Sequence, residues 1–312
     1  MSRRVLVTGG TGFIGRQTVT PLVERGFEVW LTSRDPWPED FAEYAGRSPG
    51  RIHHRAADLL RPEIPAALIE EIRPSHLLHL AWDTRHGIFW SSPENESWVA
   101  ASERLLAAFA DHGGERFIAA GTCVEYAPTS HPVSEATGVL DAGTPYGRAK
   151  LRFREQLRGA ASRRGIHTAW GRIFHLFGPY ERLPRLVPAA IDALLRGEPF
   201  PATVGTQVRD YSSVVDVAAA FVAILDSEFE GDINVASGVP STVASILRCI
   251  GDIVGRPELI RLGVIPSPEH DPPVLVADTA RLTSHFGRLF AVPLETRLRQ
   301  MVDWWAVHGI RP

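Results

Sequence analysis

The feature that most constrains the fold is a glycine-rich loop directly after the first apolar segment. Residues 4–8 have the composition of a buried strand, and Gly9-Gly10-Thr11-Gly12-Phe13-Ile14-Gly15 leads from there into a helical pattern through Leu22. In such a strand-loop-helix unit Gly9 permits the tight turn, Gly12 lets backbone approach a pyrophosphate, and Gly15 allows close helix packing. The phosphate charge then faces the amino end of the helix. The loop therefore predicts a dinucleotide-binding α/β fold.

Strand-like and helical patterns alternate along the first part of the chain. Strands are expected at 5–8, 29–32, 51–55, 76–81, 117–120 and 168–174, with long helices at 93–112 and 146–164. Such alternation is typical of a Rossmann-type, doubly wound parallel sheet.

After Gly178-Pro179 the units become shorter and contain more proline. Helices are expected at 186–196, 214–227, 242–254 and 294–308, and the strand-like segment 231–235 is expected to return to the main sheet. We therefore predict a dinucleotide-binding domain over 1–176, with a return segment at about 210–237, and a smaller, interleaved C-terminal substrate domain over 177–312.

The chain contains a single lysine, Lys150, although Lys and Arg together number 33. Tyr146 precedes it by four residues, so both side chains project from one face if a helix begins near Tyr146. A cation beside a phenol favours the phenolate and lowers its pKa from about 10. The spacing suggests a catalytic pair, although an exposed helix would give the same spacing.

Together these residues resemble the extended short-chain dehydrogenase/reductase family, in particular its nucleotide-sugar epimerases, dehydratases and reductases. That family carries the patterns TGxxGxxG and YxxxK. The resemblance covers nearly the whole chain, since further matches follow in order at Asp58-Leu59, His79-Leu80-Ala81, Gly121-Thr122, Phe177-Gly178-Pro179 and Arg209-Asp210-Tyr211.

The resemblance implies that Thr122 is a third catalytic residue beside Tyr146 and Lys150. Its hydroxyl would donate to the substrate oxygen that Tyr146 protonates. Dehydratases of the family place an Asp-Glu pair directly after this threonine, and here Cys123 and Val124 stand there, which disfavours dehydration. Glu125 would point elsewhere if the segment stayed extended.

The resemblance also implies which residues distinguish NAD from NADP. NAD-using members carry an acidic residue at the end of the second strand, whereas this chain has Ser33-Arg34. These side chains suit a 2'-phosphate, with Arg16 as a possible helper, so NADP(H) is favoured and NAD remains possible. Alternatively, Arg34 stacks on adenine without choosing between the cofactors. The predicted cofactor-binding residues are Gly9, Gly12, Phe13, Ile14, Gly15, Ser33, Arg34, Asp58, Leu59, Leu80, Ala81 and Lys150.

For the substrate, the resemblance implies a nucleoside diphosphate handle held by Arg209, with Arg185 completing the pocket. His175 stands where many relatives have asparagine, so the resemblance does not determine which group of the substrate is held there. Trp82 and His86 follow the fourth strand, at the edge where such sheets bind ligands. Simple loop packing would also explain them. The predicted substrate-binding residues are Trp82, His86, Thr122, Tyr146, His175, Arg185 and Arg209.

Composition narrows the class of protein further. A formal net charge of −3 gives no basic stripe for nucleic acid. The two cysteines, Cys123 and Cys249, lack metal-site spacing, and no apolar run approaches the length of about 20 residues that a membrane helix needs. Because no signal peptide is recognised, we expect a soluble, cytoplasmic protein. The cysteine spacing leads us to expect no metal site. The family pairs the two long helices across a homodimer interface.

Three functional hypotheses follow. The favoured hypothesis is NADPH-dependent reduction of a keto group on a nucleoside diphosphate keto-deoxysugar, and we expect this group at C4. Ser33-Arg34 favours NADP(H), and reductases of the family consume NADPH. The alternative is a nucleotide-sugar epimerase with bound NAD, which would use the same Thr122, Tyr146 and Lys150. A non-catalytic dinucleotide-binding protein is disfavoured, because such relatives usually lack the Tyr and Lys pair. The sugar and the base are not determined.

Overall fold

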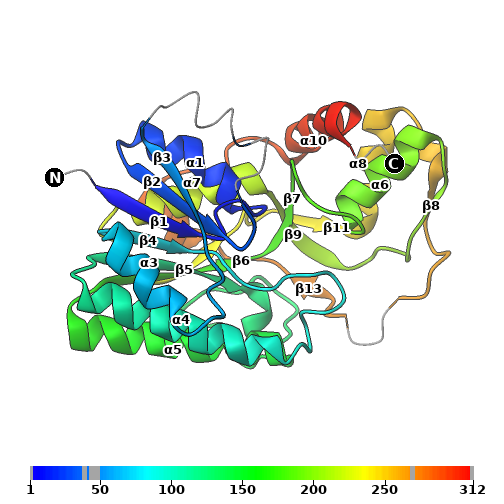
Figure 1. Ribbon diagram of the computed structural model, residues 1–312. Coiled ribbons are helices and arrows are strands. Elements are labelled where there is room, and N and C mark those ends of the chain that lie inside the picture. Colours follow the sequence, from blue (N-terminus) through cyan, green and yellow to red (C-terminus); the bar gives the residue numbers. More distant parts are fainter. Residues whose placement is uncertain (1–2, 37–40, 42–49, 268–270, 310–312) are drawn as a thin grey trace. The chain divides into compact units, whose positions relative to one another are not determined.

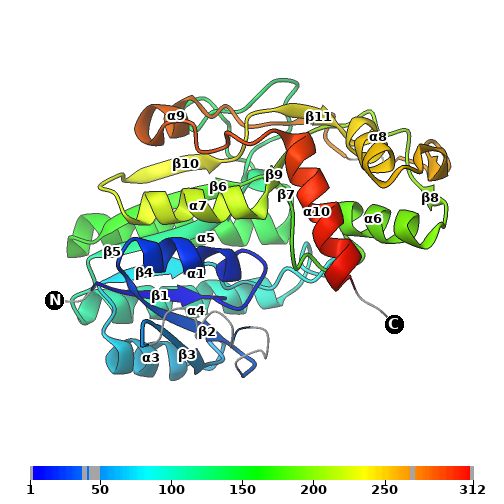
Figure 2. The same ribbon diagram turned by 90° about the horizontal axis from the view of Figure 1, so that it is seen from above.

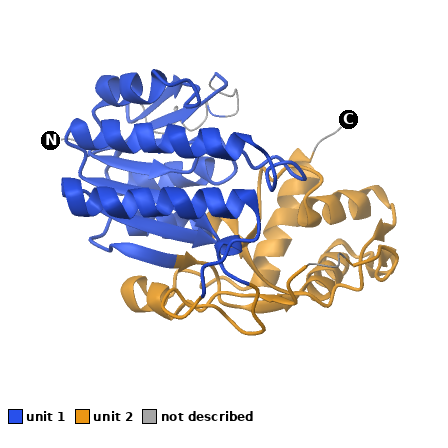
Figure 3. Ribbon diagram, turned by 90° about the horizontal axis from the view of Figure 1, so that it is seen from below, with its two compact units in different colours: residues 1–127, 139–173, 217–233 blue, residues 128–138, 174–216, 234–312 orange. Residues whose placement is uncertain are grey.

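The computed structural model describes residues 3–36, 41, 50–267 and 271–309. The chain forms two compact units that are interleaved in sequence (Figure 3). Unit 1 comprises residues 1–127, 139–173 and 217–233, and unit 2 comprises residues 128–138, 174–216 and 234–312.

Unit 1 is built on a seven-stranded sheet whose order is β10-β6-β5-β4-β1-β2-β3. The strands are β1 (Arg4–Thr8), β2 (Glu28–Ser33), β3 (Ile52–Ala56), β4 (His76–His79), β5 (Arg116–Thr122), β6 (His167–Ile173) and β10 (Gly231–Val235). Strand β1 pairs in parallel with β2 on one side and with β4 on the other, so the strand order reverses there. In sheets of this kind ligands bind at the carboxyl ends of the strands, beside the reversal. The predicted doubly wound parallel sheet is confirmed.

Helices cover both faces of this sheet (Figures 1 and 2). Helices α3 (Ile64–Ile72), α4 (Glu94–Asp111) and α5 (Pro145–Arg164) lie on one face, and α1 (Gly15–Glu24) and α7 (Val214–Leu225) lie on the other. Between sheet and helices the core is apolar, with Phe109, Phe117 and Phe153 fully buried and in edge-to-face ring contact. Both long predicted helices are present, and each differs from its predicted bounds by one residue or less at either end.

Two strands end two residues away from the predicted position, and both differences affect the candidate site. Strand β4 stops at His79 rather than at residue 81, because the amides of Leu80 and Ala81 turn to the Thr8 hydroxyl, each at 3.2 Å. Strand β5 runs on to Thr122 instead of ending at residue 120, and a short 3₁₀ helix, η2 (Cys123–Glu125), follows at once.

Unit 2 contains a smaller sheet with helices beside it. Strands β11 (Pro240–Thr242), β9 (Val208–Ser213) and β13 (Val274–Leu275) are adjacent, β7 (His175–Phe177) also pairs with β9, and β8 (Phe200–Pro201) pairs separately with β12 (Ile260–Arg261). The helices are α6 (Leu186–Arg196), α8 (Val243–Val254), η3 (Pro257–Leu259), α9 (Ala280–Phe286) and α10 (Leu294–His308). Ile191, Leu247, Ile250, Leu298 and Trp305 form the centre of its core.

Within the described ranges, no helix is both long and apolar enough to cross a bilayer. The same part of the chain holds no group of three or more His, Cys, Asp or Glu side chains arranged to bind a metal ion.

Candidate active site

The glycine loop connects β1 to α1 at the carboxyl edge of the unit 1 sheet. A Cβ on Gly15 would lie 2.3 Å from the Gly9 carbonyl oxygen and 2.7 Å from the Gly10 Cα, so only glycine fits there without a backbone shift. The loop backbone is therefore folded tightly against the first turn of α1, and the positive end of the helix dipole there favours an anion. These features fit the pyrophosphate of a dinucleotide cofactor.

The end of β2 is organised around Ser33. Its hydroxyl lies 2.8 Å from Nε2 of His54 on β3 and donates to the Asp35 carbonyl at 3.0 Å. Burial lowers the pKa of His54. Arg34 is exposed beside it, whereas Arg16 is largely buried and donates to the Thr11 carbonyl. Of the residues suggested for a 2'-phosphate, Arg34 is thus the exposed cation, and Arg16 supports the glycine loop.

A hydrogen-bonded chain under the candidate site links β1, β4 and α4. The Ser102 hydroxyl donates to the Trp98 carbonyl at 2.7 Å and lies 2.8 Å from His79 Nε2, while His79 Nδ1 lies 2.7 Å from the Thr8 hydroxyl. Since the Ser102 proton is used on Trp98, Nε2 of His79 donates to Ser102 and Nδ1 accepts from Thr8. Burial, with a smaller effect of the Lys150 charge, lowers the pKa of His79 to about 3, so the ring is neutral.

Tyr146 and Lys150 lie on successive turns at the start of α5. Thr144 caps this helix by accepting from the Gly147 amide at 3.1 Å, and Pro145 occupies its first turn. Tyr146 is only 7% exposed and Lys150 only 4%. The Lys150 ammonium lies 5.9 Å from the centre of the Tyr146 ring. The i, i+4 spacing thus brings a phenol and an ammonium to one buried face.

Besides the Tyr146 ring, the Lys150 ammonium contacts a backbone carbonyl and a second aromatic ring. Its Nζ donates to the Ala120 carbonyl at 3.0 Å and lies 3.8 Å from the centre of the Trp82 ring. Burial lowers the pKa of Lys150 to about 7, and the charge of Glu125 opposes this shift. Burial therefore makes the ammonium form of the chain's single lysine less favourable than it is in water.

Thr122 ends β5 and forms a capping box with Glu125 around η2. The Thr122 amide donates to Glu125 Oε1 at 2.8 Å, and the Thr122 hydroxyl oxygen accepts from the Glu125 amide. Because that oxygen accepts from an amide, its own O–H can be directed at another oxygen. The segment does not stay extended, as the expectation for Glu125 required, because Glu125 lies in a helical turn and its carboxylate accepts from the Thr122 amide. The T-x-x-E spacing was the signal that would have revealed this.

The segment after β4 packs around Tyr146. Trp82, Phe89 and Trp90 all meet the Tyr146 ring edge-on, at ring-centre distances of 6.4, 4.9 and 5.9 Å. Asn95 accepts from the Trp82 indole at 2.9 Å and donates to two carbonyls of the segment, a role that the sequence did not suggest. His86, in contrast, is exposed. The structure thus brings Trp82 to the catalytic candidates but does not bring His86 into the same buried cluster.

The remaining predicted substrate residues lie in unit 2. His175 is on β7, Arg209 is on β9 and paired with Asp271, and Arg185 precedes α6. Burial, followed by the Arg209 charge, lowers the pKa of His175 to about 4, and its ring stands 5.2 Å from that of Tyr211. Among the described residues, His175 Nδ1 has no hydrogen-bond partner. Burial also raises the pKa of Glu181, which the sequence did not single out, to about 8.

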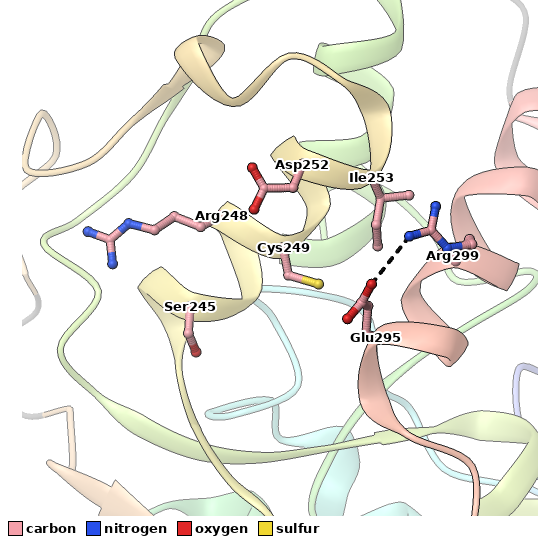
Figure 4. Close-up of a pocket in the computed structure, with 7 residues that line it drawn as sticks. All are labelled: Ser245, Arg248, Cys249, Asp252, Ile253, Glu295 and Arg299. Carbon is pink, nitrogen blue, oxygen red and sulfur yellow. Dashed lines mark hydrogen bonds and ion pairs between the residues drawn. The ribbon is translucent and has the colours of Figure 1, made fainter.

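A separate hollow of about 420 Å³ lies on α8 and α10 of unit 2 (Figure 4). None of the predicted site residues line it. Glu295 and Arg299 pair with each other at 3.3 Å in its wall, and the lining residues are Ser245, Arg248, Cys249, Asp252, Ile253, Glu295 and Arg299. Its acidic and basic side chains are equal in number, so the hollow has no net charge to select an ionic ligand.

A parallel sheet with a glycine loop after β1, a threonine ending β5 and a Tyr-x-x-x-Lys pair on the next long helix defines the class of short-chain dehydrogenases and reductases. The model of the NAD dependent epimerase/dehydratase family matches residues 5–236. The chain belongs to this family.

Relatives of similar length support the assignment. The UDP-glucose 4-epimerase of Rhizobium meliloti (strain 1021) is 26% identical over 311 residues, which cover 92% of each chain. The UDP-glucose 4-epimerase of Rhizobium leguminosarum bv. trifolii is 27% identical and covers 97% of each. The structure of Thermus thermophilus UDP-glucose 4-epimerase in complex with NAD superposes with a TM-score of 0.85 at 26% identity, covering 97% of this chain and 99% of that one.

Proposed function

We propose that this protein is a nucleotide-sugar 4-epimerase that uses NAD held at the glycine loop. The observation that carries the proposal is the buried group of Thr122, Tyr146 and Lys150 at the carboxyl edge of the sheet. Its support is the similarity of nearly the whole chain to 4-epimerases, among them one whose structure contains NAD.

In this proposal the side chains of the protein transfer the proton of the sugar hydroxyl and stabilise its oxygen. Bound NAD would supply the hydride acceptor and donor for C4 of the sugar. Tyr146 removes the proton of the sugar hydroxyl and later returns it, while Thr122 donates a hydrogen bond to the same oxygen. Lys150, when charged, stabilises the phenolate form of Tyr146. Because NAD would be regenerated within one turnover, the reaction would need no second substrate.

Arg209, Arg185 and His175 are proposed to hold the nucleoside diphosphate. Two guanidinium groups suit phosphate oxygens, and the buried His175 Nδ1, which has no hydrogen-bond partner within the described part of the chain, is available for a ligand. The predicted homodimer through α4 and α5 stays a prediction.

NADPH-dependent reduction of a keto-sugar becomes the second candidate. A specific observation favours it, since the end of β2 carries Ser33 and an exposed Arg34 rather than a carboxylate. The Ser33 hydroxyl, however, is already engaged by His54 and the Asp35 carbonyl, which leaves Arg34 as the main candidate contact for a 2'-phosphate.

One experiment separates the two candidates. Purified protein is denatured, the released dinucleotide is identified, and the native protein is assayed for conversion of UDP-glucose into its 4-epimer. Retained NAD with conversion supports the epimerase. Exchangeable binding with strong NADPH preference and no conversion supports the reductase.

Tyr146→Phe tests the catalytic assignment. It removes only the phenolic oxygen, so we expect turnover to fall at least about 100-fold, the usual weight of a positioned proton donor. Dinucleotide content is expected to match that of the wild type, which controls for folding. Unchanged turnover would remove Tyr146 from the mechanism.

A further inference from the structure

Glu125 is a fully buried carboxylate that is hydrogen-bonded to the backbone of one catalytic candidate, Thr122. Its side chain receives the Thr122 amide at 2.8 Å, the Trp170 indole at 3.0 and 3.1 Å, and the Arg172 Nε at 2.7 Å. All three partners are hydrogen-bond donors, so a protonated Glu125 carboxyl would place its own O–H against N–H groups. Burial raises the pKa of Glu125, and the bonds from Arg172, Thr122 and Trp170 act in the opposite direction by stabilising the ionised form.

Glu125 begins a row of alternating charges, here called the ion-pair row (Glu125, Arg172, Asp232 and Arg154). Arg172 also donates to Asp232 at 2.9 Å, and Arg154 donates to Asp232 through Nε at 2.9 and 3.0 Å. Burial alone would lower the pKa of Arg172, but the charges of Glu125 and Asp232 raise it. Two acids therefore balance two bases within the row.

The backbone between Glu125 and Lys150 is held from both ends. Lys150 Nζ binds the Ala120 carbonyl and Glu125 binds the Thr122 amide, with Gly121 between them. A Cβ on Gly121 would lie 2.1 Å from the Trp170 Nε1 and 2.7 Å from the Glu125 Oε1, so this glycine leaves the space that Glu125 occupies. The Lys150 ammonium and the Glu125 carboxylate thus each bind the backbone near the end of β5.

We propose that Glu125 is a positioning residue that fixes the Thr122 backbone and keeps the Lys150 ammonium charged in the active site. The role toward Thr122 rests on the proposed function, whereas the role toward Lys150 does not depend on which reaction is catalysed.

The charges around Lys150 support this role. From η2 the Glu125 carboxylate acts on it, and from β4 the neutral His79 does not oppose it. Tyr146 lies beside it on α5, and Arg172 on β6 is itself bound to Glu125. Burial lowers the pKa of Lys150 to about 7, and Glu125 is the charge that acts in the opposite direction.

Because Lys150 is the only lysine, its titration can be measured directly. Full-length protein labelled with ¹³C at lysine Cε gives a single side-chain lysine signal, followed by NMR from pH 5 to 10. In Glu125→Gln we expect the midpoint to fall by about one pH unit, as for the loss of a nearby opposite charge. The exposed Glu115→Gln makes the same charge change and should titrate within about 0.2 unit of wild type. An unshifted midpoint in folded Glu125→Gln would overturn the role toward Lys150.

Glu125→Asp tests the role toward Thr122 and guards against a misfolded Gln variant. It keeps the charge but is one methylene too short to hold both Thr122 and Arg172. We expect a Lys150 midpoint close to wild type, a kcat lowered about tenfold and a KM within about twofold, the pattern of a misplaced catalytic group. Wild-type kcat would overturn this part. If 4-epimerase activity is absent in the wild type while the Lys150 titration shifts in Glu125→Gln, the proposed function fails and the role toward Lys150 stands.

Discussion

Lys150 shows how far a single residue can be interpreted from the sequence. Its uniqueness and its spacing from Tyr146 led to a catalytic hypothesis, and the structure places both side chains on one buried face. Neither its contact with Trp82 nor the lowering of its pKa to about 7 follows from spacing, because both depend on burial by distant segments.

His79 is the residue whose ionisation should most affect acid stability. Burial lowers its pKa from 6.5 to about 3. Between these two pH values the unfolded chain binds a proton at this residue that the native chain does not bind. Its stabilising contribution is complete above pH 6.5 and is lost as the pH falls toward 3, at about 1.4 kcal/mol per pH unit.

His79→Gln removes this proton linkage. At pH 7.5 we expect a loss of about 1 to 3 kcal/mol of unfolding free energy, because the hydroxyls of Thr8 and Ser102 lose a partner. Below pH 6.5 the gap to wild type should narrow by about 1.4 kcal/mol per pH unit. Urea titrations at several pH values measure this. The exposed His86→Gln should keep the wild-type slope, and a gap that stays constant with pH would contradict the assignment.

At the scale of elements, the glycine loop and α1 act as one unit. The contact that matters is between backbones, since the space for a Cβ on Gly15 is taken by the Gly9 carbonyl and the Gly10 Cα. A side chain there would force the loop away from the start of α1.

Gly15→Ala should therefore weaken dinucleotide binding at least about tenfold and lower the melting temperature, because backbone atoms cannot step aside as a flexible side chain can. The matched control is Gly143→Ala, where no atom lies within 4 Å of the added Cβ. That variant should stay within about 0.5 kcal/mol of wild type and bind normally. Calorimetric titration with NAD and thermal melts give both quantities, and equal effects of the two substitutions would be inconsistent with the steric argument.

Elements were predictable where one local pattern determined them. Helices α6 and α10 and strand β10 have the predicted bounds, because their apolar periodicity and their ends are local. Strand β4 was predicted two residues too long, since its end depends on a hydroxyl 71 residues away, that of Thr8. The 3₁₀ turn η2 was missed although its capping-box spacing was visible.

At the scale of the whole molecule, the chain leaves unit 1 and returns to it to add β10 to the sheet. Asp232 on β10 then closes the ion-pair row with Arg154 of α5 and Arg172 of β6. The return segment therefore contributes a buried counter-charge as well as a strand.

Asp232→Asn should destabilise the protein by about 3 to 5 kcal/mol, because two buried guanidinium groups lose their shared carboxylate. Glu230→Gln, two residues away, removes an exposed pair with His167 and a charge that also acts on Arg116, and it should cost less than about 1 kcal/mol. Urea unfolding of both variants tests this difference. Similar losses would mean that the row contributes no more than a surface ion pair.

The sequence by itself determined the parallel sheet, the glycine loop, the Tyr146 and Lys150 pair and the family, because these depend on short-range spacing and periodicity. Only the tertiary structure decided that Lys150 is buried against Trp82, that His79 is neutral, and that Arg172 joins Glu125 to Asp232. The physical reason is that a pKa and a buried ion pair depend on groups brought together by strand pairing. Glu125 is 47 residues from Arg172 along the chain, and Arg172 is 60 from Asp232.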